Sequence, residues 1–140
     1  MPPVDLLGRP LRSLRVSVTD RCNLRCEYCM PEQEYVWLER ANLLHFEEID
    51  RLVDAAISIG VDKIRLTGGE PLLRKDLPDL VRLLAAKPAR TDIALTSNGM
   101  LLQDLAEPLE HAGLKRLNIS LDTLRPERFL QLTRQDAHSR

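Results

Sequence analysis

The chain has 140 residues, with 20 basic and 21 acidic side chains and a formal net charge of −1 at pH 7. A chain of this length supports one hydrophobic core, and its near-neutral charge provides no global field for nucleic acid or anionic lipid. No apolar run approaches the ~20 residues of a membrane-spanning helix, and the N-terminus lacks the basic and apolar segments of a secretory signal. We therefore expect a cytoplasmic protein that binds neither nucleic acid nor a membrane.

Short segments with strand-like patterns alternate with helical patterns along the chain. The predicted strands are Leu14–Thr19, Asp62–Thr67, Thr91–Ser97 and Lys115–Asp122. The first helix is expected from Phe46 to Ile57, with Gly60 after its end, and the second from an N-cap at Asp76 to before Pro88. The third is expected within Leu101–Ala112, where Pro108 causes a late start or a bend, and the fourth begins near Pro126. This alternation is typical of parallel strands joined by right-handed crossovers, so we expect one α/β domain or part of one.

Each predicted strand has an apolar and a polar set of side chains. In the second strand, Ile64 and Leu66 alternate with Lys63, Arg65 and Thr67. Parallel strands covered by helices on both faces are apolar on both sides, so the polar set needs an explanation. One explanation is an open sheet with a hydrated second face. We favour about half of a partial TIM barrel with a polar interior, because a closed barrel needs ~250 residues.

All three cysteines, Cys22, Cys26 and Cys29, lie in the loop that follows the first predicted strand. Loops at the carboxyl ends of parallel strands carry the chemistry of barrel enzymes. Thiolates with the spacing C-x3-C-x2-C can hold a 4Fe–4S cluster and leave one iron open to an outside ligand. The alternative is structural zinc with His45 or His111 as a further ligand, although zinc sites normally have paired ligands and neither histidine lies in such a motif.

Further loops at the same predicted edge carry Gly68-Gly69-Glu70-Pro71 and Thr96-Ser97-Asn98-Gly99. Two glycines let the backbone approach a ligand closely or adopt a positive φ. The cysteine motif with Tyr28 before its last cysteine, the Gly-Gly-Glu-Pro motif and the serine-bearing fourth strand together resemble radical S-adenosylmethionine (SAM) enzymes. Within that superfamily, the stretches SVTDRCNLRCEYCMP, RLTGGEPLLR and LNISLDTL are similar to the MoaA-type GTP 3′,8-cyclases of molybdenum cofactor biosynthesis.

The resemblance implies roles for individual residues. The cysteines would ligate a 4Fe–4S cluster whose open iron binds SAM, with Tyr28 near the adenine, Gly69 receiving the methionine ammonium, Ser120 contacting SAM, and Arg15, Arg65 and Thr96 binding GTP. Arginines suit a triphosphate because their planar donors can pair with two oxygens at once. Without the resemblance, Arg15 and Arg65 could equally be salt-bridge partners inside the barrel.

The activity implied is that of a lyase that converts GTP to (8S)-3′,8-cyclo-7,8-dihydroguanosine 5′-triphosphate by a radical mechanism. Such an enzyme needs a low-potential electron donor, and its protein part orients the reactants and excludes water. The alternatives are another radical SAM enzyme that modifies a peptide or a cofactor, and a non-catalytic zinc-binding module.

Members of this family also carry a second 4Fe–4S cluster on C-terminal cysteines and end in a double glycine needed for activity. No cysteine follows Cys29 in this chain. We therefore expect residues 1–140 to be the N-terminal portion of a radical SAM barrel domain, without the C-terminal cluster region and inactive alone. An open edge on the fourth strand would favour self-association, which leaves a homodimer open.

Overall fold

The computed structural model describes residues 3–32, 34–88 and 91–136. Its centre is a parallel sheet in the order β1 (Ser13–Ser17), β2 (Lys63–Thr67), β3 (Asp92–Ser97) and β4 (Arg116–Ile119). The helices are α1 (Phe46–Ser58), α2 (Leu77–Ala85), α3 (Leu102–His111) and α4 (Pro126–Thr133), with short 3-10 turns η1 (Arg40–Asn42) and η2 (Pro71–Leu73). Each crossover leads to the next strand in sequence, which is the order of a barrel rather than of a doubly wound sheet. The predicted α/β class is confirmed.

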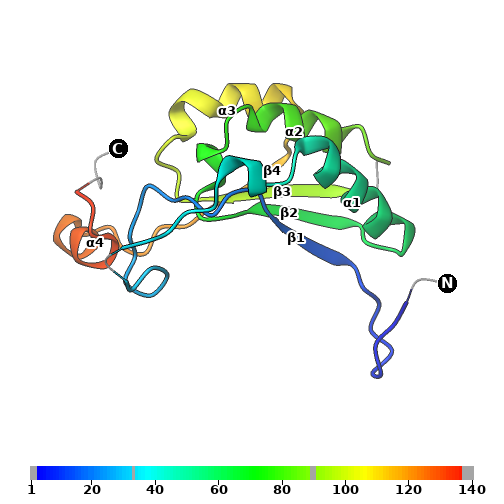
Figure 1. The fold of residues 1–140 in the computed structure, drawn as a ribbon, viewed down its shortest axis with the longest axis horizontal. Helices are drawn as coiled ribbons and strands as arrows, with labels where there is room; N and C mark the ends of the chain where they lie inside the picture. The colour runs from blue at the N-terminus through cyan, green and yellow to red at the C-terminus, as the bar shows by residue number, and fades with distance from the viewer. Residues whose placement is uncertain (1–2, 33, 89–90, 137–140) are drawn as a thin grey trace.

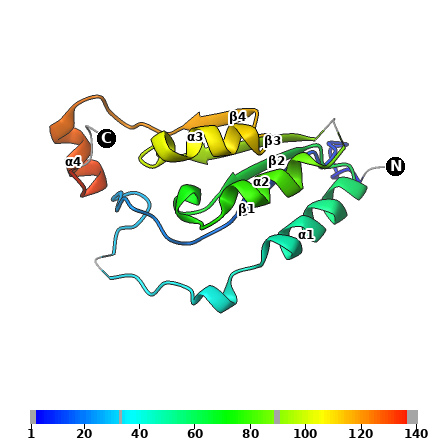
Figure 2. The same cartoon turned by 90° about the horizontal axis from the view of Figure 1, so that it is seen from above.

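The crossover helices α1, α2 and α3 all cover one face of the sheet (Figures 1 and 2). Between them lies the core, in which Ile64, Leu66 and Leu95 of the strands are at most 1% exposed. Arg15 and Arg65, which alternate with the core residues, are exposed on the other face. The sheet therefore has the predicted apolar and polar faces, and no helix of the described residues lies over the polar one.

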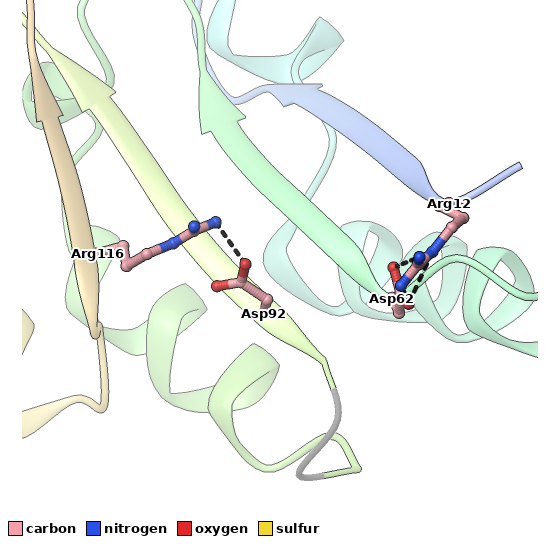
Figure 3. Close-up of polar contacts among 4 residues, drawn as sticks. All are labelled: Arg12, Asp62, Asp92 and Arg116. Carbon is pink, nitrogen blue, oxygen red and sulfur yellow. Dashed lines mark hydrogen bonds and ion pairs between the residues drawn. The ribbon is translucent and has the colours of Figure 1, made fainter.

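Ion pairs join neighbouring strands at the amino ends of the sheet (Figure 3). Arg12, just before β1, donates from Nε to Oδ2 of Asp62 at 3.1 Å, and Arg116 of β4 pairs with Asp92 of β3. The backbone amides of Asp62 and Lys63 each donate to the Arg12 carbonyl oxygen at 3.0 Å. Contacts at this edge fix the strands, so the loops at the carboxyl edge are the ones available for binding.

The structure differs from the predicted elements at particular residues. Asp76 stands at the N-cap of α2, but its φ is 57° and its side chain makes no capping hydrogen bond, so the predicted mechanism is wrong. The predicted late start of the third helix is also wrong, because α3 begins at Leu102 and continues through Pro108. Proline removes one helical donor, and the adjacent Leu109, which is 1% exposed, anchors the helix in the core.

The fourth strand is shorter than predicted, since regular pairing ends at Ile119. One further backbone bond, from the Ser120 amide to the Ser97 carbonyl oxygen at 2.9 Å, continues the ladder. Within the described ranges, no helix has the length and apolar character needed to cross a bilayer.

Candidate functional site

The cysteine loop, residues 19–31, leaves the carboxyl end of β1. The amides of Cys29 and Met30 both donate to the Cys26 carbonyl oxygen, at 3.0 and 2.7 Å, which closes a tight turn around the last two cysteines. Leu24 donates its amide hydrogen to Sγ of Cys22 at 3.4 Å. All three thiols are free, with Cys22 and Cys26 half-buried and Cys29 exposed. The loop thus presents its thiols at one edge of the sheet.

Helix α4 lies beside the cysteine loop (Figures 1 and 2). The amides of Arg25 and Glu27 donate to the carbonyl oxygens of Thr133 and Leu132, at 2.9 and 3.0 Å, in the last turn of α4. Cys22 and Cys26 pack against a small apolar cluster that includes Phe129 of this helix. Carbonyl groups at a helix end have no partner within the helix, so α4 offers free acceptors to the loop.

The Gly-Gly-Glu-Pro loop packs directly against the backbone of the cysteine loop. Gly69 donates its amide hydrogen to the Thr19 carbonyl oxygen at 2.8 Å, and Glu70 donates to that of Arg21 at 2.7 Å. A Cβ on Gly69 would lie 2.3 Å from the Arg21 oxygen, and one on Gly68 would lie 2.5 Å from the Thr19 oxygen. The close neighbour that requires glycine in this structure is therefore the cysteine loop itself.

A buried carboxylate connects this loop with the end of β3. Glu70 is 1% exposed, and its Oε1 accepts hydrogen bonds from the Leu72 amide at 3.0 Å and from Ser97 Oγ at 2.8 Å. Its Oε2 accepts from the Asn98 amide at 2.8 Å. Asn98 in turn donates from Nδ2 to Oδ1 of Asn23 in the cysteine loop at 2.7 Å. The sequence analysis did not assign a role to Glu70 or Asn23, although an acidic residue directly before the apolar residues Pro71 and Leu72 was a usable signal.

The thiols and Tyr28 have shifted proton affinities. Burial raises the pKa of Cys22, and the hydrogen bond from Leu24 opposes it in part. Burial also raises the pKa of Cys26, and a hydrogen bond from Tyr28 lowers it in part. The Tyr28 hydroxyl donates to Oδ2 of Asp122 at 2.8 Å, and partial burial together with this bond raises the pKa of Tyr28. Cys22 and Cys26 are therefore neutral thiols at pH 7 without metal, and binding iron must release their protons.

Three thiols on one loop fit an iron–sulfur cluster in their chemistry. In the described residues, no group of three or more His, Cys, Asp or Glu is placed to share a single metal ion. A cluster does not require such sharing, because each thiolate binds a different iron. All three thiols belong to the same short loop, residues 19–31. Soft thiolates are the ligands that iron–sulfur clusters prefer.

The histidines considered for zinc have other positions. His45 is the N-cap of α1, where its amide donates to Oε2 of Glu48 at 2.7 Å, and His111 ends α3. His45 does line a cavity of about 750 Å³ that also reaches Cys22. Among the described residues, neither histidine belongs to a group of three or more His, Cys, Asp or Glu placed to hold one metal ion.

The residues expected to contact SAM and GTP lie at the carboxyl edge and on the polar face. Gly69 contacts the cysteine loop, Tyr28 belongs to that loop, and Ser120 is exposed just after β4. Arg15 and Arg65 are register partners on β1 and β2. Neither guanidinium takes part in an ion pair among the described residues. Neighbouring strands are about 4.8 Å apart, so two like charges stand side by side without a counter-charge.

The remaining predicted contact, Thr96, pairs with Asn118 across β3 and β4. Its Oγ1 is buried and lacks a hydrogen-bond partner in the described part of the chain. Buried hydroxyl groups are nearly always hydrogen-bonded, so this oxygen is an acceptor and donor available to a bound molecule.

Comparison with known proteins agrees with this arrangement. Residues 16–140 match the model of the Radical SAM superfamily, and the chain belongs to that superfamily. It is 58% identical over 139 residues to a GTP 3′,8-cyclase of Acidothermus cellulolyticus and 53% identical over 141 residues to GTP 3′,8-cyclase 3 of Mycobacterium bovis, covering 96% and 98% of this chain. These matches span only 38% and 37% of the relatives, so the chain corresponds to less than half of their length.

Solved structures share the fold. A crystal structure of Streptococcus suis SuiB bound to S-adenosylmethionine superposes with a TM-score of 0.68 at 24% identity, over 86% of this chain and 27% of SuiB. A second structure of SuiB, bound to the precursor peptide SuiA, gives a TM-score of 0.66 at 21% identity, with 86% and 26% covered. At these identities, the likeness supports the partial-barrel architecture alone.

Proposed function

We propose that the chain forms the cluster- and SAM-binding part of a GTP 3′,8-cyclase, a radical SAM lyase of molybdenum cofactor biosynthesis. The observation that carries the proposal is the cysteine loop, whose three free thiols lie at the carboxyl edge of a barrel-type sheet. Curated relatives between 50% and 58% identical to the chain are named for this activity. The product of the proposed reaction is (8S)-3′,8-cyclo-7,8-dihydroguanosine 5′-triphosphate.

In this proposal, Cys22, Cys26 and Cys29 hold the 4Fe–4S cluster. When bound, the reduced cluster supplies the electron for the reductive cleavage of SAM, while the protein binds and orients the reactants and excludes water. Tyr28 and Gly69 belong to the backbone segments next to the thiols, and Ser120 follows β4 at the same edge. These positions support the proposed SAM contacts, with the Tyr28 ring anchored by Asp122.

Arg15, Arg65 and Thr96 are the proposed GTP contacts. Two adjacent guanidinium groups repel each other unless an anion lies between them, and a triphosphate supplies such an anion. Thr96 lies on β3, next to the strand of Arg65, and its buried Oγ1 has no hydrogen-bond partner among the described residues. The polar face therefore carries both charge and hydrogen-bonding groups suited to a nucleotide.

For the whole enzyme, the proposal includes a second 4Fe–4S cluster, a low-potential electron donor and assembly as a homodimer, without nucleic acid or membrane partners. It also places the enzyme in the cytoplasm. The relatives extend well beyond the matched part, since the chain covers 37% to 41% of their length. We accordingly expect the 140 residues alone to bind a cluster and SAM without cyclising GTP.

Anaerobic reconstitution with iron and sulfide tests the cluster. The chain is expected to take up iron with the broad visible absorption of an iron–sulfur cluster, and Cys26→Ala is expected to lose most of it. A stable protein with one zinc and no iron uptake would favour the zinc-binding module and contradict the proposal.

Nucleotide binding tests the cyclase against other radical SAM enzymes. Arg65→Ala should weaken GTP binding about 10- to 100-fold in calorimetry, because a charged hydrogen bond contributes about 1.5–3 kcal/mol. Cys26→Ala should retain GTP binding. Arg51→Ala is the matched control, since Arg51 is exposed on α1, on the opposite face. Equal GTP affinity in wild type and Arg65→Ala would favour an enzyme that acts on a different substrate.

A further inference from the structure

A chain of hydrogen bonds runs across the carboxyl edge of the sheet and joins loops from three different strands. It begins at the buried Glu70 after β2, passes through Asn98 after β3 and reaches Asn23 after β1. The final bond, from Nδ2 of Asn98 to Oδ1 of Asn23, is 2.7 Å long and joins residues 75 positions apart. Asn23 directly follows Cys22, so this bond acts beside the first cysteine.

The backbone amide and the side-chain oxygen of Asn98 are both held by hydrogen bonds, independently of its bond to the cysteine loop. Its amide is held at 2.8 Å by Oε2 of Glu70, whose side chain is 1% exposed and therefore needs hydrogen-bond donors around it. The side-chain oxygen of Asn98 accepts from the Met100 amide at 3.1 Å, which sets the orientation of the amide group. Nδ2 is thereby directed at Asn23 from a rigid base.

The opposite end of the cysteine loop is held by a different element. There, the amides of Arg25 and Glu27 bind the end of α4, and Cys29 lies beyond them in an exposed position. Besides the backbone bonds from the Gly-Gly-Glu-Pro loop to Thr19 and Arg21, the cysteine loop is thus attached by Asn98 near Cys22 and by α4 nearer Cys29. Removing the Asn98 attachment should affect the two cysteines unequally.

We propose that Asn98 is a positioning residue that fixes Cys22 through Asn23, so that the cysteine loop is ordered before it receives its cluster. The identity of the ligand rests on the proposed function, whereas the ordering of the loop is a property of the metal-free chain. Preorganised metal ligands lose less conformational entropy on binding, so the Asn98–Asn23 hydrogen bond would favour uptake of the cluster.

The test measures alkylation rates of each cysteine in the metal-free chain by mass spectrometry. Asn98→Ala and Asn23→Ala each remove the Asn98–Asn23 bond and leave the backbone bond from residue 98 to Glu70 in place. Each variant should raise the rate at Cys22 about fivefold, the change that corresponds to a typical hydrogen bond of about 1 kcal/mol. The rate at Cys29 should stay within a factor of two, a margin of roughly 0.4 kcal/mol.

The double variant distinguishes positioning from a general loss of stability. If the two amides act through one bond, Asn23→Ala adds nothing further in the Asn98→Ala background, whereas independent effects multiply. Asn42→Ala is the matched control, because Asn42 is an exposed asparagine in η1 whose side chain makes no hydrogen bond among the described residues. It should leave every rate unchanged.

The outcomes separate this inference from the proposed function. Unchanged labelling of Cys22 in Asn98→Ala, an equal increase at Cys29, or multiplied effects in the double variant would each overturn the positioning role. These results would stand whether or not the wild-type chain takes up iron. Conversely, a chain that fails to bind iron but shows the unequal, non-additive labelling would keep the positioning role and refute the cluster.

Discussion

Replacing Gly69 with alanine would test whether the glycine pair holds the cysteine loop in place. The new Cβ would lie 2.3 Å from the Arg21 carbonyl oxygen and 2.6 Å from that of Asp20, both of them backbone atoms. Carbon–oxygen contacts shorter than about 3.3 Å are unfavourable, so the loops must separate by about 1 Å. That movement weakens the Gly69–Thr19 and Glu70–Arg21 hydrogen bonds, which are 2.8 and 2.7 Å long.

The expected cost follows from these contacts. Overpacking costs about 1–3 kcal/mol, and each lost hydrogen bond adds about 1 kcal/mol, so Gly69→Ala should lower the free energy of unfolding by about 3–5 kcal/mol. Urea unfolding measures this loss by circular dichroism and by the fluorescence of Trp37, the single tryptophan, whose ring stacks on Arg25 of the cysteine loop.

Gly8→Ala is the matched control for this measurement. Gly8 has a φ of 76°, but a Cβ there would meet nothing within 4 Å. The control therefore contains backbone strain, about 1–2 kcal/mol, without a steric clash. If Gly69→Ala proved no less stable than Gly8→Ala with both probes, the packing of the two loops would not depend on glycine and the reasoning would be refuted.

Two sites of ion pairing, one around Lys87 and one at Asp62, give further predictions. Lys87 lies 2.7 Å from both Asp50 and Asp54 of α1, and Lys87→Met should cost about 1–2 kcal/mol in thermal unfolding because both carboxylates lose their partner. Burial lowers the pKa of Lys87, but its bonds to the carboxylates raise it overall above 10.5, so this contribution is present at neutral pH and should be lost as pH rises past that value. The Arg12 hydrogen bond lowers the pKa of Asp62 below 3.8, so its contribution is lost as pH falls below 3.8, and Asp62→Asn should flatten the acid limb of a urea-midpoint titration.

The sheet could be predicted from the sequence because its pattern is local and repeated. Ile64 and Leu66 alternate with Arg65 and Thr67, and a strand places such residues on opposite faces. The burial of Ile64 and Leu66 and the exposure of Arg65 follow directly from this alternation. Helix ends were less predictable, because neither the left-handed backbone of Asp76 nor its missing side-chain cap can be seen in the sequence.

Contacts between the loops could not be predicted in the same way. Glu70 and Asn98 are 28 residues apart, and Asn98 and Asn23 are 75 apart, so no periodic pattern connects them. The sequence showed that Gly68 and Gly69 permit a close approach, but it did not show whether a ligand or a backbone makes it. Only the folded arrangement identifies the cysteine loop as that neighbour.

The separate motifs at the carboxyl edge depend on one another physically. The cysteine loop contributes one strongly buried apolar side chain, Leu24, so hydrophobic packing fixes little of it. Its position instead comes from hydrogen bonds to the Gly-Gly-Glu-Pro loop, to Asn98 and to the end of α4. Each of these bonds is weak alone, and a loop held by several weak bonds opens locally at a lower free energy than the core. A substitution that removes one of these bonds without a steric clash, such as Asn98→Ala, should therefore loosen the thiols well before it unfolds the sheet.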